Sequence, residues 1–234
     1  MKSKATRTIW PAFIQVVAFA AFVNLLQIMA PSQTHAEPMT EPIRIVAFGD
    51  SLTAGYGLPQ SAAFPVQLAK VLRARGHQVE IVNAGVSGDT TAAGLERFDW
   101  AVAEKTDAVI LELGANDALR GLSPRDAHAN LDKIIAKLTA RGIDVLLAGM
   151  SAPRSMGAEY VSEFDRIFPD LAQHHNLLLY PFFLDGVAGR KDLNLDDGIH
   201  PTAKGVGIIV ERMVPKVEEL LARVVAKRSA ASKS

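Results

Sequence analysis

Serine, histidine and aspartate, which together can form a nucleophile with a proton acceptor, occur at two separated places in this chain. Ser51 follows an apolar run and the dipeptide Gly49-Asp50, and His200 follows Asp197 by three residues in a turn that contains glycine. An aspartate that bonds one imidazole nitrogen leaves the other nitrogen free to take a proton from a serine hydroxyl. These residues predict nucleophilic chemistry on Ser51, with Asp197 and His200 as its acid-base partners.

His200 stands apart from the other five histidines, because only it has a carboxylate three residues before it in such a turn. The others fall in the N-terminal segment or at the ends and surfaces of predicted helices. Two plainer interpretations stay open at this point. Ser51 could instead cap the following helix, and the turn at Asp197 could be an ordinary surface turn.

Two further loops offer groups that could hold a negatively charged oxygen. The first, residues 83–90, contains Gly85 and Gly88, and the second, residues 114–117, contains the side-chain amide of Asn116. Transfer of an acyl group needs hydrogen-bond donors aimed at the developing oxyanion, and backbone N–H groups with an amide are a suitable set. Glycine, asparagine and aspartate are also what ordinary turns require, so each loop alone leaves both interpretations open.

Short apolar runs alternate with helix-like segments from residue 42 onward, which is typical of a parallel sheet with helices on both faces. Five strands with right-handed crossovers favour a flavodoxin-like α/β fold, a three-layer α/β/α sandwich with strand order 2-1-3-4-5. Ligands bind such sheets at the carboxyl ends of the strands, where Ser51, Gly88 and Asn116 are expected. The predicted strands are residues 43–48, 79–83, 108–113, 143–149 and 177–180.

The helix between the third and fourth strands has the clearest signals of a start and an end. Ser123 is placed to cap it, Pro124 suits its first turn, and Gly142 supplies the stop. Its apolar stripe has the spacing i, i+3, i+4, i+7 and consists of Leu131, Ile134, Ile135 and Leu138. Further helices are predicted at about residues 63–75, 90–105, 159–175 and 202–225, the last with a kink at Pro215.

The composition predicts one globular domain, which we place at residues 37–225. The chain has 234 residues, of which 49% are hydrophobic and 21% charged, enough for a substantial core. Lysine plus arginine and aspartate plus glutamate both number 25, so no basic field indicates a nucleic-acid partner. Cysteine is absent, which excludes a disulfide framework, a thiolate metal site and a cysteine nucleophile.

The N-terminus has the pattern of a secretory signal peptide, which we place at residues 1–36. Basic residues precede an apolar run at about residues 9–30, and a polar stretch then leads to the small residue Ala36. An uncleaved membrane anchor stays an alternative because the run is long. The pattern predicts a periplasmic or secreted protein with no stable membrane partner after cleavage. At the other end, residues 226–234 are predicted to be a flexible polar tail.

Four short blocks of the sequence occur in an order that is typical of one enzyme family. They are Gly49-Asp50-Ser51-Leu52, Ser87-Gly88-Asp89-Thr90, Gly114-Ala115-Asn116-Asp117 and Asp197-Gly198-Ile199-His200-Pro201. These blocks resemble the GDSL or SGNH hydrolase family, most of all its bacterial branch of thioesterase I, lysophospholipase and arylesterase. One such tetrapeptide would be a weak signal, whereas four ordered blocks behind a signal peptide are specific.

The resemblance implies a role for each residue singled out above. Ser51 would be the nucleophile, His200 the general base and later the general acid, and Asp197 the carboxylate that orients His200. The oxyanion hole would consist of the backbone N–H groups of Ser51 and Gly88 and the side-chain amide of Asn116. The family also implies the SGNH hydrolase fold, no cofactor, no metal, and a small acyl ester or thioester as substrate.

Two features bear on the size of that substrate. Ala115 departs from the family pattern, because relatives of this branch often carry glycine there, and its methyl group could narrow the space beside the oxyanion hole. The segment of residues 151–164, with Met156 and Tyr160, is expected to form a wall of the site or else to be an ordinary connection. Acyl-chain preference therefore stays open.

Two other functions fit parts of the sequence. Asp50, Asn116 or Asp117, Asp197 and His200 could bind a divalent cation for phosphoester hydrolysis at the same sheet edge. A non-catalytic exported binding domain is the third interpretation, because doubly wound folds serve many functions. The serine triad explains all four blocks, whereas a metal site explains only the acids, and this difference favours an esterase or thioesterase.

Overall fold

The computed structural model describes residues 41–232, and the predicted signal segment, residues 1–36, lies outside them. The described residues all belong to one unit of the chain. Among them, no helix combines the length and the apolar character needed to cross a bilayer. Cleavage or anchoring of the N-terminal segment therefore stays a prediction.

Five parallel strands form one sheet in the order β2-β1-β3-β4-β5, which confirms the predicted flavodoxin-like fold. The side chains of β3 are all buried, because helices cover both faces of the sheet. Each strand begins and ends within two residues of its predicted bounds. The strands are β1 (Ile43–Gly49), β2 (Val79–Gly85), β3 (Ala108–Glu112), β4 (Asp144–Ala148) and β5 (Leu178–Tyr180).

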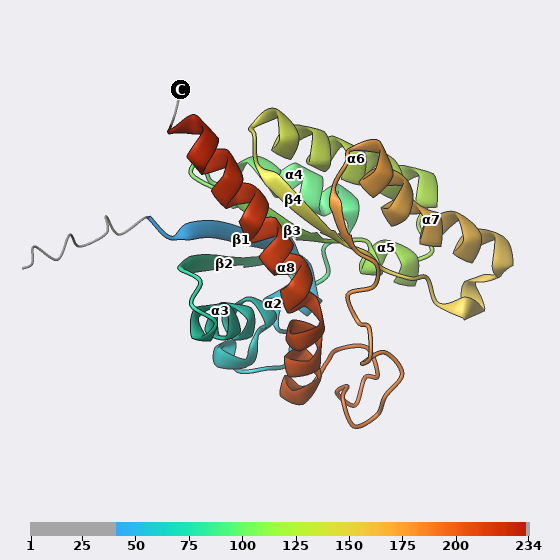
Figure 1. The fold of residues 1–234 in the computed structure, drawn as a ribbon. Coiled ribbons are helices and arrows are strands. Elements are labelled where there is room, and N and C mark those ends of the chain that lie inside the picture. Colours follow the sequence, from blue (N-terminus) through green and yellow to red (C-terminus); the bar gives the residue numbers. More distant parts are fainter. Residues whose placement is uncertain (1–40, 233–234) are drawn as a thin grey trace, which may run out of the picture. The chain divides into compact units, whose positions relative to one another are not determined.

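Helices form the two outer layers (Figure 1). On one face α3 (Phe64–Ala74) packs against α8 (Ala203–Ala231). On the other face lie α4 (Thr91–Ala101), α6 (Pro124–Ala140) and α7 (Ala158–His174), with α6 in contact with both neighbours. Two short helices that the sequence did not predict, α2 (Ser51–Ala54) and α5 (Ala115–Leu119), follow β1 and β3 at the carboxyl edge of the sheet.

The α6 helix is built as its sequence predicts. The hydroxyl of Ser123 accepts a hydrogen bond from the backbone N–H of Asp126 at 3.3 Å, and Pro124 occupies the first turn. Gly142 adopts a φ of 69° just after the helix, a conformation that glycine adopts without strain. The predicted apolar stripe is buried against the sheet and consists of Leu131, Ile134, Ile135 and Leu138.

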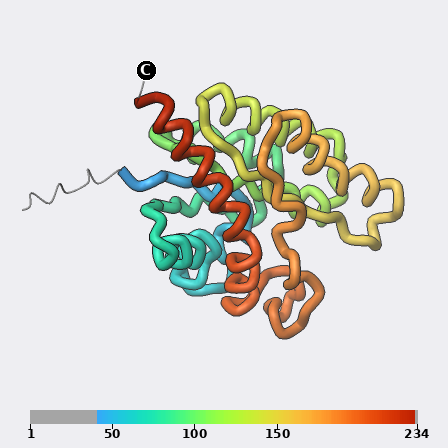
Figure 2. The backbone as a smooth tube through the Cα atoms, in the orientation of Figure 1, coloured from blue at the N-terminus to red at the C-terminus, as the bar shows by residue number. Residues whose placement is uncertain are grey.

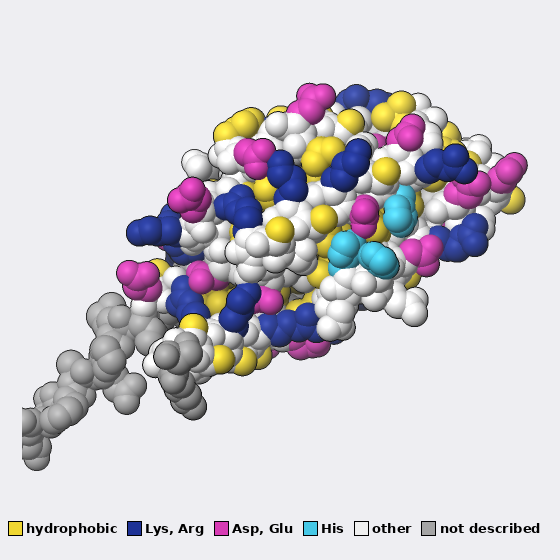
Figure 3. Space-filling model, turned by 90° about the horizontal axis from the view of Figure 1, so that it is seen from above, with side chains coloured by type: hydrophobic (Ala, Val, Ile, Leu, Met, Phe, Trp, Pro, Cys, Tyr) yellow, Lys and Arg dark blue, Asp and Glu magenta, His cyan; other side chains and the backbone are white. Residues whose placement is uncertain are grey.

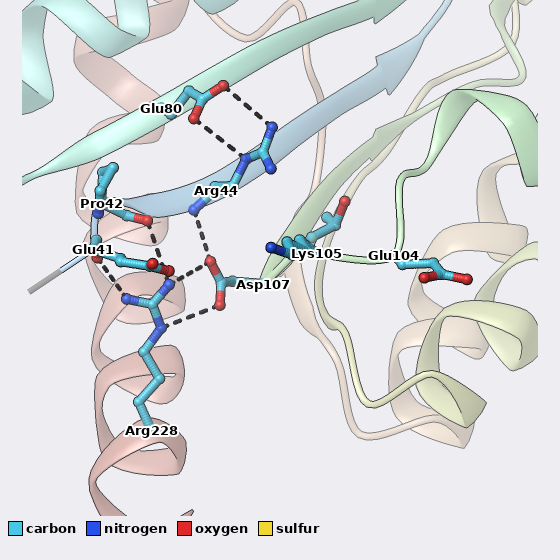
Figure 4. A pocket seen from close by; sticks show the side chains of 9 residues that line it. Glu41, Pro42, Arg44, Glu80, Glu104, Lys105, Asp107 and Arg228 are labelled. Carbon is cyan, nitrogen blue, oxygen red and sulfur yellow. Dashed lines mark hydrogen bonds and ion pairs between the residues drawn. The ribbon is translucent and has the colours of Figure 1, made fainter. Parts of the chain in front are cut away.

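The final helix, α8, continues to Ala231, so the predicted helix end near residue 225 is too early. Arg228 donates to the carboxylate of Asp107 at 2.7 Å and to the carbonyl oxygen of Glu41 at 2.8 Å. Figure 4 shows this guanidinium reaching the chain where β1 begins, beside a polar cavity of about 770 Å³. These bonds hold a basic segment in the helix that composition alone predicts to fray.

The connection of residues 181–202 between β5 and α8 carries the predicted acid-base pair. Figure 2 shows it as an orange loop that folds back on itself before α8. The backbone N–H of Leu195 donates to the carbonyl of His200 at 2.7 Å and thereby closes the turn that contains Asp197. The buried amide of Asn194 donates to two carbonyl groups of the same connection, both at 2.8 Å. A segment without regular structure is thus held in a defined conformation.

Candidate active site

Ser51 is the first residue of α2 and directly follows the end of β1. The side chain of Asp50 accepts a hydrogen bond from the backbone N–H of Leu52 at 2.9 Å and caps the helix. The alternative that Ser51 is itself the cap is therefore wrong, and its hydroxyl is left for other partners. The turn from strand to helix places this side chain at the carboxyl edge of the sheet, where it lines a cleft.

Ser51 and His200 meet in space although they lie far apart in the sequence. The hydroxyl oxygen of Ser51 is 2.9 Å from Nε2 of His200, and Nδ1 of the same ring is 2.7 Å from Oδ2 of Asp197. These two distances are within the range for hydrogen bonds. In this arrangement an imidazole can accept the serine proton while a carboxylate holds its other nitrogen.

Asp197 bonds both the backbone and the ring of the residue it supports. Its Oδ1 accepts hydrogen bonds from the backbone N–H groups of Ile199 at 2.9 Å and His200 at 3.0 Å. The bonds from the His200 backbone, the His200 ring and the Ile199 backbone lower the pKa of Asp197 to about 2. The carboxylate is therefore charged at neutral pH, which favours a proton on Nδ1 and a free Nε2 facing Ser51.

Tyr56 is a neighbour of His200 that sequence reasoning did not single out. The two ring centroids are 4.4 Å apart at an interplanar angle of 37°, and the tyrosine is half exposed. Its backbone N–H donates to the carbonyl of Ser51 at 3.0 Å, so it is positioned by the same turn as the nucleophile candidate. The phenol ring therefore restricts how the imidazole can turn on that side.

Of the two other predicted oxyanion donors, Asn116 lines the cleft and Gly88 does not. Asn116 lines the cleft with Ser51, and its amide nitrogen donates to Oδ2 of Asp50 at 3.0 Å and to the carbonyl of Asp89 at 2.9 Å. Gly88 is not among the residues that line the cleft, and it adopts a φ of 87°. The side chain of Asn116 is therefore at the cleft with both amide hydrogens engaged, while Gly88 lies outside the lining.

Arg97 of α4 links the end of β1 to the loop that follows β2. Its buried guanidinium forms an ion pair with Asp89 and donates to the carbonyl of Gly49 at 2.9 Å. It also lies over the ring of Phe48, 4.2 Å from the centroid. A buried cation needs such partners to offset its lost hydration, and here they tie together the loops that carry the site.

Glu112 lies beneath the turn that contains Asp50 and Ser51 and is fully buried. Its Oε2 accepts a hydrogen bond from the hydroxyl of Thr53 at 2.7 Å and one from the backbone N–H of Asp50 at 3.3 Å, while its Oε1 has no partner. Burial raises the pKa of Glu112 well above its ordinary value, and the nearby Asp50 raises it further. The same loss of hydration raises the pKa of Asp50 to about 6. We infer that Glu112 holds its proton to a higher pH than an exposed glutamate does.

Replacing Glu112 by alanine should therefore destabilise the protein more than replacing it by glutamine, which resembles the protonated acid. The alanine variant leaves the Thr53 hydroxyl and the Asp50 N–H without their acceptor, so its free energy of unfolding should fall by about 1–3 kcal/mol more. A carboxyl with a raised pKa binds its proton more tightly in the folded state, so wild-type stability should decline relative to the glutamine variant as pH rises. Urea denaturation at several pH values measures both effects. Equal stability of the two variants, with no such pH trend, would contradict the inference.

The site opens into a cleft of about 920 Å³, a volume suited to a small ligand. The predicted wall of residues 151–164 contributes only residues 151–154, because Tyr160 turns away and donates its hydroxyl to the carbonyl of Leu122 at 2.8 Å. Sequence reasoning missed most of the apolar lining, which comes from the short helices α2 and α5 and from loops without a periodic pattern. Its larger side chains are Leu52, Leu119, Met150, Pro153, Phe182, Leu184 and Ile199.

The side chains of the alternative cation site do not converge on a common centre. The oxygens of Asp50 bond the Leu52 N–H and Asn116, and those of Asp197 bond the turn that contains His200. Asp117 is turned to Thr91, whose hydroxyl and backbone N–H both donate to its carboxylate. Within residues 41–232, the histidine and carboxylate groups close enough to hold a metal ion lie elsewhere. The geometry therefore does not favour the phosphoesterase interpretation.

Two curated bacterial proteins show extensive similarity to the chain. Esterase TesA of Pseudomonas aeruginosa is 38% identical over 178 residues, which cover 76% of this chain and 89% of the relative. An arylesterase of Vibrio mimicus is 37% identical over 169 residues, covering 72% of this chain and 84% of the relative. The similarity thus extends over most of both relatives.

A solved structure and a family profile agree with these relatives. The crystal structure of AlinE4, described as an SGNH-hydrolase family esterase, is 48% identical and covers 78% of this chain and 98% of that one, with a TM-score of 0.66. The profile of the GDSL-like Lipase/Acylhydrolase family matches residues 47–208. That match spans all four sequence blocks, from Gly49 to Pro201, and the chain belongs to this family.

Proposed function

We propose that this chain is a serine hydrolase that cleaves carboxylic esters or thioesters through an acyl-enzyme on Ser51. One observation carries the proposal: hydrogen bonds run without a break from the Ser51 hydroxyl to His200 and from His200 to Asp197, at 2.9 and 2.7 Å. Both relatives described above bear the names of ester-cleaving enzymes, which is consistent with this chemistry. The proposal assigns Ser51 as nucleophile, His200 as general base and Asp197 as the orienting carboxylate.

The reaction proceeds in two halves. The Ser51 oxygen attacks the acyl carbonyl while Nε2 of His200 takes the hydroxyl proton, and the tetrahedral intermediate forms. His200 then gives that proton to the leaving alcohol or thiol as the bond to the acyl carbon breaks. A water molecule repeats the sequence on the acyl-enzyme, releasing the carboxylic acid and restoring Ser51. Asp197 stays ionised throughout and stabilises the imidazolium form of His200.

The oxyanion of each tetrahedral intermediate needs donors, and we propose the backbone N–H groups of Ser51 and Gly88 with the amide of Asn116. The position of Asn116, which lines the cleft together with Ser51, supports this role. Its amide hydrogens point to Asp50 and to the carbonyl of Asp89. Donation to an oxyanion therefore requires one of these bonds to be shared or given up, and catalytic hydrogen bonds often tighten only in the reacting complex.

Replacing Asn116 by alanine should lower kcat by a factor of about 10² to 10³ with little change in KM, because one oxyanion donor is lost. Steady-state kinetics with a p-nitrophenyl ester measures both constants. Since the amide also bonds two neighbouring loops, the thermal unfolding of the variant must be measured alongside. A change in KM alone would assign Asn116 to substrate binding instead.

The cleft supports a small acyl ester or thioester as the substrate class. Its apolar lining suits the hydrocarbon part of an acyl group, and Ser51 and His200 lie among these apolar side chains. Arylesters, acyl thioesters and lysophospholipids all share this acyl chemistry. A series of p-nitrophenyl esters and acyl thioesters of increasing chain length measures the preferred acyl chain and leaving group, since the rate should fall once the chain exceeds the cleft.

An organophosphonate ester provides the direct test of the proposed reaction class. It should inactivate the enzyme with a stoichiometry of one and leave its phosphonyl group on Ser51, as peptide mass spectrometry would show, while EDTA leaves the rate unchanged. Loss of activity with EDTA together with resistance to the phosphonate would instead favour the cation-dependent phosphoesterase. A correctly folded protein that turns over none of the esters or thioesters would favour the non-catalytic binding domain.

We further propose that the chain is exported to the periplasm or secreted after cleavage near Ala36. The basic start, apolar run and small residues of the N-terminal segment support this. N-terminal sequencing of the protein from the expressing cell tests it. A mature protein that starts near residue 37 is the expected result, and an intact Met1 in the membrane fraction would indicate an anchor.

A further inference from the structure

A second group of ionisable side chains lies away from the cleft, where α6 packs against α7. Asp132 belongs to α6, His174 is the last residue of α7, and His175 is its C-cap. One possible ligand atom from each of the three residues lies within 4.8 Å of the other two. Figure 3 shows histidine side chains gathered on one face of the molecule beside an acidic side chain.

The three side chains are already partly organised. Nε2 of His175 is 2.6 Å from Oδ1 of Asp132, and the rings of His174 and His175 lie 4.7 Å apart, nearly perpendicular at 89°. The side chain of His175 is 16% exposed and that of Asp132 is 42% exposed, so solvent reaches the pair only in part. His174 is exposed and completes the group from the solvent side.

We propose that Asp132, His174 and His175 bind one divalent transition-metal ion, with Zn²⁺ as the ion that fits best. Two imidazoles and a carboxylate are a donor set that zinc accepts, whereas Mg²⁺ and Ca²⁺ prefer oxygen ligands alone. Donors of a tetrahedral zinc site with bonds of about 2.0–2.1 Å stand about 3.3 Å apart, so small rotations of these side chains suffice. Water completes the fourth position.

The arrangement differs from an ordinary aspartate–histidine pair by its second imidazole. His77 provides the comparison within the same chain, because its Nε2 lies 3.1 Å from Glu218, and the second partner of that carboxylate is the cation Arg75 instead of an imidazole. A metal ion at Asp132, His174 and His175 would link the C-terminal end of α7 to α6. It would therefore stabilise the fold and take no part in hydrolysis.

Calorimetric titration of the metal-free chain with ZnCl₂ tests the proposal, using protein without a polyhistidine tag. Wild type should bind one Zn²⁺ per chain. D132N or H174A should weaken binding by at least about 10-fold, since the loss of a residue that only supports a metal ligand already lowers the metal affinity by that factor. H77A should bind like wild type, as should H200A, which removes the imidazole of the catalytic candidate. Zn²⁺ but not Mg²⁺ should raise the Tm of wild type, and H174A should lose that shift.

Each outcome decides the matter. His174 is exposed, so its alanine variant is expected to fold, and circular dichroism verifies this. Absence of Zn²⁺ binding by folded wild type would overturn the proposal, as would binding that survives unchanged in both D132N and H174A. Loss of binding in H200A would place the ion at Ser51 and His200 instead, which is also a contradiction. Ester hydrolysis by H174A at the wild-type rate separates this site from the proposed active site.

Discussion

Alanine in place of Ser51 should lower kcat by a factor on the order of 10⁴ or more, because the acyl group then has no oxygen to which it can transfer. Alanine in place of His200 should cost about as much, since the hydroxyl at 2.9 Å from its Nε2 loses its proton acceptor. The kcat of the double variant should be only slightly lower than that of either single variant, because the loss of one residue already removes the function that the two perform jointly. Steady-state kinetics with one ester substrate measures all three.

A serine in the same cleft provides the matched control. Ser151 also lines the cleft, and within residues 41–232 it forms no hydrogen bond with Ser51, Asp197 or His200. Ser151→Ala should therefore keep near wild-type kcat. Losses that add in the double variant of Ser51 and His200 would show independent roles, contrary to the proposed mechanism.

The second large effect is expected from Asp197→Asn, with a fall in kcat of about 10⁴ while the fold is kept. An amide oxygen can still accept the backbone N–H groups of Ile199 and His200, so the turn should survive. The amide N–H₂, however, cannot accept a proton from Nδ1 of His200. The ring would then favour the tautomer with a proton on Nε2, which cannot accept one from Ser51.

Asp196 supplies the control for this variant, because it is an exposed carboxylate next to Asp197. Asp196→Asn should leave kcat unchanged. The pKa of Asp197 is lowered to about 2, so its charge is present at higher pH and is lost only as pH falls through that value. An acid limb of the pH–rate profile well above pH 2 therefore belongs to other groups. Equal losses in both variants would indicate a general field effect rather than orientation of His200.

The fold was predictable because its strands are continuous apolar runs and its helices carry local signals. The capping Ser123 and the stripe beginning at Leu131 set α6, and tertiary packing agrees with them. The end of α8 was missed for the opposite reason. Arg228 bonds Asp107, far away in the sequence, and no local pattern reports such a partner.

The meeting of Ser51 with the Asp197 turn could be expected from residue types and from the shared sheet edge. Other parts of the site could not. Glu112 lies within the predicted strand of residues 108–113, and no sequence pattern indicates that its carboxyl lies under the turn of Asp50. The same holds for Tyr56, whose ring faces His200 only because two distant loops are folded together.

The proposed acyl-enzyme is the claim on which the mechanism depends, and it can be trapped. The enzyme is mixed with excess p-nitrophenyl ester, quenched in acid within the first turnovers, and digested for peptide mass spectrometry. We expect a mass increase equal to the acyl group on the peptide that contains Ser51, and none in Ser51→Ala. An acyl group on another residue, or turnover of wild type with no acylated peptide under conditions where the first product is released in a burst, would contradict it.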